Sequence, residues 1–395
     1  MTYNFDERID RTGRGQAKWE PAGLKEMFGD ENMLSYWVAD MDFRVAQPIR
    51  DALIEAAEHG CIGYTGLDPA FYNAYINWQK RRNGWEPDVS WFRYTPGVVP
   101  AINLLLLAMT NEDDEILIQR PVYYPFTDSI VKQKRTVVSS SLVNKGGRYE
   151  IDFEDFEKKA SSPKCTAFVL CNPHNPAGRV WERWALEKAM EVFEANQCFV
   201  ISDEIWADIT YTGHQHTPTL MVNDWAQEHT VAVYAPSKTF NLAGLIGSYH
   251  IIYNKYLRDR VTAHGDATHY NEMNVLSMHA LIGAYSDEGR EWVSELLQVL
   301  EGNCKYACDH IRQHYDGVDV SMPQGTYMLF LDLTDYCRRT GKTLDQVIKA
   351  GWDVGVAWQD GRAFHGPCHI RMNLASPLSR IQEAFDRLDK YVFNA

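Results

Sequence analysis

The sequence lacks the features that mark several large classes of protein. Its apolar runs fall far short of the roughly 20 residues that a membrane-spanning helix needs, and its first 20 residues contain no apolar stretch of the kind found in signal peptides. It has no Gly/Ser-rich linker and no repeat with a period of about 20 to 50 residues. These absences predict a non-repetitive globular protein of the cytoplasm, with no membrane partner.

Positive charge is also scarce. The 395 residues include 39 lysines and arginines against 53 aspartates and glutamates, which gives a formal net charge of −14. A chain this acidic lacks the overall basic field of nucleic-acid-binding proteins, so we expect no nucleic-acid partner.

Metal-binding and redox cysteine motifs are missing as well. No two of the eight cysteines form a CxxC pair, which argues against a zinc ribbon or a thioredoxin-like centre. Several cysteines lie in apolar runs and are expected to be buried free thiols. His214 and His216 stand in a polar loop where the spacing suggests no third ligand, so we predict exposed histidines and no metal site.

What the sequence does contain is an alternation of strand and helix patterns. Residues 184–196 have helical spacing, and the apolar residues on one face are Leu186, Ala189, Met190 and Phe193. Short apolar runs predict buried strands at residues 116–118, 167–170, 199–201, 231–234 and 249–253. This alternation favours an α/β fold, in which a large domain holds a mostly parallel sheet flanked by helices and a smaller α+β domain lies beside it.

The length of the chain predicts two or three domains. Residues 286–314 are expected to form a long bridging helix with Ser286 as its N-cap, and Gly302 is a point where that helix could break. The predicted parts are an N-terminal arm with part of the small domain (1–48), a large domain (49–285), and the bridging helix with the C-terminal small domain (286–395).

Two charged residues follow predicted strands, the places where open α/β sheets bind ligands. Lys238 lies just past a strand, beside Ser237. Desolvation there would lower the pKa of Lys238 and free its amine to form a Schiff base, and a solvated loop lysine is the alternative. Asp203 ends another strand, where it could be a helix N-cap or the partner that keeps a pyridine nitrogen protonated.

Two turns add further groups. Asn175 lies in the turn at residues 171–178, where two X–Pro bonds could be cis. Its amide can donate to a phenolate oxygen, and a plain strand-to-helix turn is the alternative. His174 beside it is expected to be exposed. Gly97 opens a helix, and the first free N–H groups of that helix suit a phosphate.

These groups together describe a site for pyridoxal 5′-phosphate, and the ring of Tyr123 could stack on the pyridine face. The motifs NPHNPAG, SDEI and SKTFNLAGL follow one another in this order along the chain. With them, the sequence resembles the fold-type I pyridoxal-phosphate enzymes of the aminotransferase class I/II family. The resemblance extends from Trp37 to Arg371.

The resemblance implies a role for each residue of the site. Lys238 would bind the cofactor and carry a proton, and Asp203 would pair with the pyridine nitrogen. The other expected cofactor contacts are Asn175 at the ring hydroxyl, Tyr123 on the ring face, and Val98, Val99 and Ser237 at the phosphate. Arg371 would clamp the α-carboxylate of a small amino-acid substrate through its guanidinium fork, with help from the backbone near Ala39.

Within the family, the chain is most similar to the cystathionine β-lyase and C–S lyase branch, the MalY/PatB type. WVADMDF at residues 37–43 is the clearest sign, and GYTG at residues 63–66 agrees with it. In this branch the tyrosine of GYTG, here Tyr64, reaches the cofactor phosphate of the neighbouring subunit. The resemblance therefore implies a homodimer.

Two positions depart from the aminotransferase pattern. The position eight residues after the lysine, usually an arginine, is Ile246, and the position three residues after the aspartate, usually a tyrosine, is Trp206. The missing arginine favours a lyase over a transaminase. The indole of Trp206 can donate to the ring oxygen but cannot accept a hydrogen bond, and packing in the pocket wall is the alternative.

The implied activity is a β-elimination from L-cystathionine or a related cysteine S-conjugate, which yields a thiol, pyruvate and ammonia. A pyridoxal-phosphate-dependent aminotransferase is the alternative, because this fold hosts both reactions. A third hypothesis is a regulator that uses the fold as a binding module, but every expected catalytic position is filled.

Overall fold

A seven-stranded sheet forms the centre of the larger part of the protein. The computed structural model describes residues 2–66 and 69–393. In the sheet, β10 runs antiparallel to β2 and β9, and the neighbouring pairs from β9 to β4 are parallel. In spatial order the strands are β2 (Phe92–Thr95), β10 (Ser248–Ile251), β9 (Thr230–Tyr234), β8 (Phe199–Asp203), β7 (Cys165–Cys171), β3 (Glu115–Ile118) and β4 (Thr136–Ser139).

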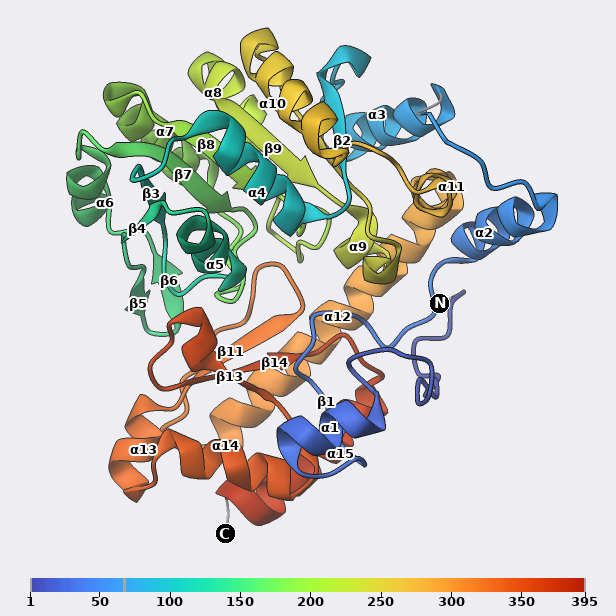
Figure 1. Ribbon diagram of the computed structural model, residues 1–395. Helices are drawn as coiled ribbons and strands as arrows, with labels where there is room; N and C mark the ends of the chain where they lie inside the picture. Colours follow the sequence, from blue (N-terminus) through green and yellow to red (C-terminus); the bar gives the residue numbers. More distant parts are fainter. Residues whose placement is uncertain (1, 67–68, 394–395) are drawn as a thin grey trace.

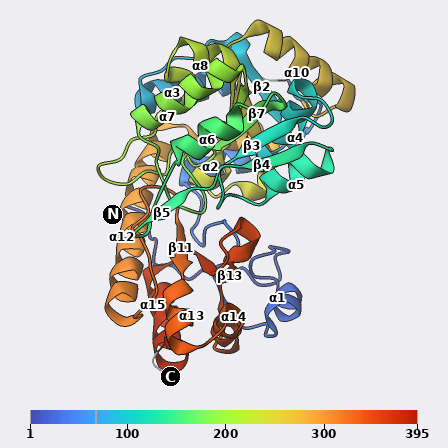
Figure 2. The same cartoon turned by 90° about the vertical axis from the view of Figure 1, so that its left-hand side faces the viewer.

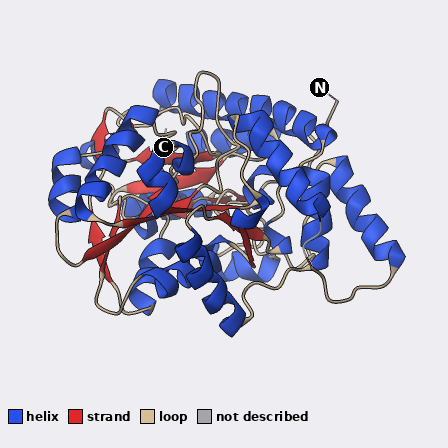
Figure 3. Cartoon of the chain, turned by 90° about the horizontal axis from the view of Figure 1, so that it is seen from above, coloured by secondary structure: helices blue, strands red, loops and turns tan. Residues whose placement is uncertain are grey.

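Helices cover both faces of this sheet. Successive strand residues point to opposite sides, and the apolar residues of the strands therefore face helices on both sides. In β3, Ile116 and Ile118 belong to one apolar cluster, whereas Leu117 belongs to the cluster on the other face. Figures 1 and 3 show the helices on either side of the strands. The first face is covered by α4 (Val98–Met109), α5 (Pro125–Lys132) and α10 (Lys255–Thr268), and the second by α6 (Phe153–Ala160), α7 (Arg183–Asn196) and α8 (Asp224–His229).

A third group of helices packs beside β10 and β2. It consists of α2 (Gln47–His59), α3 (Pro69–Asn83) and α11 (Val275–Ala284). The ring of Tyr75 meets that of Tyr249 with centroids 4.1 Å apart. Helices α2 and α11 approach so closely that a Cβ at Gly283 would lie 2.5 Å from the carbonyl oxygen of Pro48, so only glycine fits there.

The long helix α12 (Asp287–His314) runs from the large sheet to the C-terminal part of the chain (Figures 1 and 2). The side chain of Ser286 caps it by accepting from the N–H of Gly289 at 3.1 Å, as predicted. The predicted break at Gly302 is absent, because the helix continues through that residue. Within residues 2–66 and 69–393, no helix combines the length and apolar character needed to cross a membrane.

The C-terminal part is built on a three-stranded antiparallel sheet, to which the N-terminal segment adds. Leu34 and Ser35 pair in parallel with Val356 and Ala357, so the start of the chain lies against its end (Figure 1). The elements are α1 (Pro21–Phe28), β1 (Leu34–Ser35), β11 (Met328–Asp332), α13 (Thr334–Thr340), α14 (Leu344–Asp353), β12 (Val356–Ala357), β13 (Gln359–Asp360), β14 (His369–Asn373) and α15 (Leu378–Leu388). The domain boundaries drawn from the sequence stay a prediction.

The cysteines are free thiols, as predicted. Five are buried, among them Cys171 and Cys198, and Cys61 is exposed. Burial raises the pKa of the Cys304 thiol well above its usual value, so this thiol stays protonated at neutral pH.

Candidate active site

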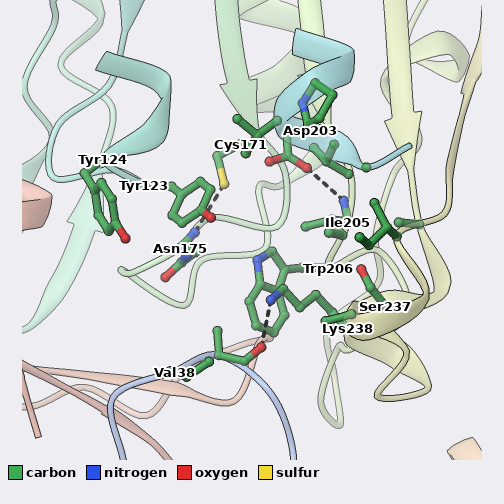
Figure 4. Close-up of a pocket in the computed structure, with 18 of the residues that line it drawn as sticks. Val38, Tyr123, Tyr124, Cys171, Asn175, Asp203, Ile205, Trp206, Ser237 and Lys238 are labelled. Atoms are coloured by element: carbon green, nitrogen blue, oxygen red, sulfur yellow. Dashed lines mark hydrogen bonds between the residues drawn. The ribbon is translucent and has the colours of Figure 1, made fainter. Parts of the chain in front are cut away.

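The carboxyl ends of the parallel strands open into a cavity of about 430 Å³. It lies where the large sheet, the N-terminal segment and the C-terminal sheet meet. Figure 4 shows Tyr123, Asn175, Trp206 and Lys238 around this common space. The predicted site residues that line the cavity are Ala39, Val98, Val99, Tyr123, Asn175, Asp203, Trp206, Ser237, Lys238 and Arg371. Tyr64 does not line it and is fully exposed in the single chain.

Lys238 projects into this cavity from α9 (Pro236–Thr239), the short helix that follows β9. Its Nζ donates to the carbonyl oxygen of Ala39 at 2.7 Å and lies 5.6 Å from the ring centroid of Trp206. Desolvation, aided by the positive charge of Arg371, lowers the pKa of Lys238 to about 8, although Asp40 and Asp203 oppose this shift. The amine is therefore available as a nucleophile or base closer to neutral pH than an ordinary lysine.

Asp203 is the last residue of β8 and is 3% exposed. No helix begins there, and Oδ1 accepts from the N–H of Ile205 within a turn at 3.1 Å, so the N-cap alternative is wrong. Desolvation raises the pKa of Asp203 to about 7 despite that hydrogen bond and the charge of Lys238. In the described part of the chain this carboxyl group forms no ion pair, and a cationic ligand group in the cavity would favour its charged form.

Asn175 is held in a turn whose Asn172–Pro173 and Asn175–Pro176 bonds are both cis. Its Oδ1 accepts from Nη1 of Arg371 at 3.3 Å. Because the amide oxygen is used there, Nδ2 is the group left to donate to a ligand.

His174, in the same turn, is fully buried, so the prediction that it is exposed was wrong. Its imidazole packs against the ring of Trp181, with centroids 5.5 Å apart, and Nε2 lies 3.3 Å from the carbonyl oxygen of Gln119. Burial lowers the pKa of His174 to about 3, so it is a neutral structural residue that does not line the cavity.

The segment from β2 to α4 forms the part of the cavity wall that suits a phosphate. Gly97 has a φ of 110°, a left-handed conformation that favours glycine, and α4 begins at the next residue. The first N–H groups of α4, from Val98 and Val99, have no acceptor within the helix and lie at the positive end of its dipole. Ser237 lines the same cavity from α9.

Arg371 projects from β14 and is 3% exposed. Nη2 donates to the carbonyl oxygen of Trp37 at 2.8 Å and to the side-chain oxygen of Gln359. Nε has no partner among the described residues. Burial lowers the pKa of Arg371 to about 10, which still leaves it cationic at neutral pH. A buried guanidinium that meets no carboxylate in the described chain suits an anionic ligand.

His216 also differs from its prediction. It is 4% exposed, and its Nε2 lies 2.7 Å from Oε2 of Glu204, the neighbour of Asp203. Glu204 is also bound by the hydroxyl of Tyr234 and the N–H of Thr219, so this buried group anchors the loop after β8. No cluster of metal-ligating side chains occurs within residues 2–66 and 69–393.

Three residues that line the cavity or bond to its wall were not predicted. Tyr327 donates to the carbonyl oxygen of Ala39 at 3.1 Å and packs edge-on against Trp206, with ring centroids 4.7 Å apart. Asn373 follows Arg371 by two residues in β14, and the two-residue period of a strand was a usable signal. Gln359 comes from a strand of only two residues, which carries no recognisable pattern.

The groups in the cavity fit pyridoxal 5′-phosphate. Lys238 supplies an amine of lowered pKa, and the carboxyl group of Asp203, which forms no ion pair among the described residues, suits a pyridinium nitrogen. The start of α4 suits the phosphate. Arg371, whose Nε has no partner among the described residues, suits the carboxylate of an amino-acid substrate.

The chain is similar over nearly its whole length to several known proteins. Cystathionine beta-lyase PatB of Bacillus subtilis (strain 168) is 35% identical over 98% of both chains. The crystal structure of cystalysin from Treponema denticola, which contains a pyridoxal 5′-phosphate cofactor, has a TM-score of 0.93 and 30% identity, covering 99% of this chain and 98% of that one. The PLP-bound putative aminotransferase from Clostridium difficile 630 has a TM-score of 0.92 and 33% identity, covering 98% and 99%.

These similarities confirm the predicted α/β fold class and the predicted family. The model of the family "aminotransferase class I and II" matches residues 38–388, which run from the N-terminal segment beside Ala39 to the end of α15. The chain therefore belongs to the aminotransferase class I and II family.

Proposed function

We propose that this protein is a pyridoxal 5′-phosphate-dependent C–S β-lyase, which cleaves L-cystathionine or a related cysteine S-conjugate to a thiol, pyruvate and ammonia. The observation that carries the proposal is the convergence of Lys238, Asp203 and Arg371 on one cavity. The 35% identity with a cystathionine beta-lyase over nearly the whole chain supports this activity.

Seven residues would hold the cofactor in addition to Lys238. Asp203 would face the pyridine nitrogen, and Asn175 would donate to the ring hydroxyl oxygen. The remaining contacts would be Tyr123 on the ring face, Val98, Val99 and Ser237 at the phosphate, and Trp206 in the wall. Bound there, the cofactor would supply a carbonyl carbon for the substrate amine and a ring that withdraws electrons from the α-carbon.

The protein groups then have separate tasks. Arg371 binds the α-carboxylate and fixes the orientation of the substrate, with the N–H of Ala39 as a further donor. The amine of Lys238, free while substrate is bound, would take up the proton of the α-carbon. Asp203 would stabilise a positive charge on the pyridine nitrogen, which favours removal of the α-proton. The sulfur group would then leave and take up a proton from Lys238 or from water to give the thiol.

The alternative is transfer of the amino group to a keto acid. The similarity to a putative aminotransferase keeps it open. Ile246, which stands where aminotransferases of this family usually carry an arginine, lines the cavity and supports the lyase instead.

We also propose that the protein is a homodimer in which Tyr64 contacts the cofactor phosphate of the partner subunit. Tyr64 and Ile62 are strongly exposed in the single chain, although they are large apolar residues. Two exposed apolar side chains this close together suit a segment that a partner covers.

The test is pyruvate release from L-cystathionine by the purified protein loaded with pyridoxal 5′-phosphate, with no keto acid present. We expect pyruvate and a new free thiol in equal amounts. If neither cystathionine nor other S-substituted cysteines give pyruvate, and amino groups pass to an added keto acid, the lyase is excluded in favour of the aminotransferase.

Arg371→Lys is expected to lower kcat/KM for cystathionine by about 100-fold, mostly through KM, because a lysine cannot form the bidentate contact with a carboxylate. Saturation kinetics of the variant measure this effect. Arg179→Lys is the matched control, because Arg179 is also buried but pairs with Glu182 outside the cavity. If KM is unchanged in Arg371→Lys, a role for Arg371 in binding the substrate is excluded.

A further inference from the structure

Residues 37–41 have no regular secondary structure, and we call this segment the strap. Its first three residues, Trp37, Val38 and Ala39, line the cavity. Each of its five carbonyl oxygens accepts a hydrogen bond from a side chain. The donors are Arg371 to Trp37 (2.8 Å), Asn373 to Val38 (2.5 Å), Lys238 and Tyr327 to Ala39 (2.7 and 3.1 Å), Lys18 and Asn373 to Asp40 (3.1 and 2.6 Å), and Arg11 and Asn241 to Met41 (2.9 and 3.0 Å).

Two of these donors are the residues that act on the substrate. Lys238 and Arg371 bond to carbonyls only two residues apart, at Ala39 and Trp37. A carbonyl in a loop is ordinarily free to bind water and to move with the backbone. Here the position of the strap fixes the amine and the guanidinium relative to each other.

Asn373 holds the strap on either side of Ala39. Its Nδ2 donates to the carbonyls of Val38 and Asp40, and its Oδ1 accepts from the N–H of Ala375 at 2.8 Å, which sets the orientation of the amide. The side chain is 1% exposed. Both ends of the amide are therefore used, and neither faces the cavity.

Lys18 holds the strap from the N-terminal segment and is fully buried. Its Nζ donates to the carbonyl of Asp40 and to Oδ2 of Asp42, both at 3.1 Å. Asp42 is buried as well and also accepts from Arg11 and Trp19, at 2.7 Å each. A buried cluster of charged residues outside the cavity is thus linked, through Lys18, to the strap carbonyl of Asp40, next to Ala39.

We propose that Asn373 and Lys18 are positioning residues that fix the Ala39 carbonyl as the acceptor for the free amine of Lys238. This inference rests on the proposed function, in which the amine of Lys238 is free while substrate is bound. The acceptor directs the amine and keeps it from taking other rotamers of its long side chain. Neither positioning residue lines the cavity.

The proposal has a consequence for the titration of Lys238. A carbonyl acceptor stabilises the charged ammonium form, whereas desolvation and the charge of Arg371 disfavour it, and Asp40 and Asp203 favour it. If the Ala39 carbonyl moves away, the pKa of Lys238 falls below its value in the native chain.

The test compares Asn373→Ala with Asn303→Ala. Asn303 is the matched control, because it is 2% exposed and its Nδ2 also spans two carbonyls, those of Leu374 and Ser376, at 3.0 and 2.9 Å. The first measurement is the rate at which the cofactor-free full-length chain takes up pyridoxal 5′-phosphate as a function of pH. That rate reports the fraction of Lys238 that is unprotonated.

We expect the pH midpoint of uptake to fall by about one unit in Asn373→Ala and to stay unchanged in Asn303→Ala. Lys18→Met, which keeps the length of the side chain but removes its charge and donors, is expected to shift the midpoint in the same direction. In the loaded enzyme, kcat/KM falls by about 10- to 100-fold in Asn373→Ala through misplacement of Lys238 and Arg371.

The inference is overturned if Asn373→Ala and Lys18→Met fold, as judged by thermal unfolding, and keep the native midpoint. It is overturned equally if Asn303→Ala shifts the midpoint as much as they do, since the effect would then follow lost stability. If Asn373→Ala does not fold, Lys18→Met alone decides the test. If Lys18→Met does not fold, Arg11→Gln takes its place. The uptake assay needs no substrate, so a failure of the proposed lyase activity is seen separately.

Discussion

Lys238→Ala is expected to lower pyruvate release from cystathionine by about 10,000-fold or more, because under the proposed function the variant loses both the cofactor-binding amine and the base for the α-proton. The measurement is single-turnover pyruvate formation with excess enzyme. The loss of a covalent link also predicts that dialysis removes the cofactor from the variant but not from the native protein.

The fold is expected to survive this change. The Ala39 carbonyl keeps the hydrogen bond from Tyr327 when Lys238 is removed, so no buried acceptor is left unpaired. Lys349→Ala is the control, because Lys349 is exposed and its ion pair with Asp353 lies on α14. Residual activity of Lys238→Ala within 10-fold of the control would show that another group carries the proton.

Asp203→Asn is expected to lower kcat/KM by roughly 100- to 1,000-fold, because a neutral amide cannot stabilise a positive charge on the pyridine nitrogen. Steady-state kinetics at saturating cofactor measure the loss. Asn is close to Asp in size, so the change tests charge rather than packing.

The same variant is expected to be more stable than the native chain when both lack cofactor. The pKa of Asp203 is about 7 in the folded chain, above its ordinary value of 3.8. Ionising the carboxyl therefore costs stability, and that cost grows as pH rises from 3.8 to about 7. Thermal unfolding at pH 8 should give a higher Tm for Asp203→Asn, and a lower Tm would show that the carboxylate is stabilised by the fold.

Together these two results would separate catalysis from folding at one residue. A group that lowers the free energy of unfolding of the cofactor-free chain, yet is needed for the reaction, is present for function. Other interactions in the fold must offset its destabilising effect. Tm and kcat/KM are expected to move in opposite directions for Asp203→Asn.

The sequence was enough to place the residues at the ends of the parallel strands. Asp203 and Lys238 each follow a buried run, and the carboxyl ends of parallel strands meet at one edge of the sheet. Asn175 could be placed for the same reason. Arg371 is far away in sequence, and only the resemblance to a family linked it to the others.

Two histidines show where local sequence misled. His174 and His216 stand among polar and turn-forming residues, which predicts exposure. Their burial depends on partners elsewhere in the chain: Gln119 lies 55 residues before His174, and Glu204 lies 12 residues before His216. The polarity of a loop sequence does not predict whether a residue at the end of another strand will bind and bury its histidine.

The sequence by itself determined the α/β class and, through its motifs, the family. It also located Asp203, Lys238 and Asn175 at strand ends, because strand-end positions and residue types are local properties. Only the tertiary structure decided how those groups are held. The strap uses backbone carbonyls as acceptors. Every residue has a backbone carbonyl, so no sequence pattern predicts which ones accept these hydrogen bonds. Their donors, among them Lys18 and Asn373, come from opposite ends of the chain and meet the strap only when it folds.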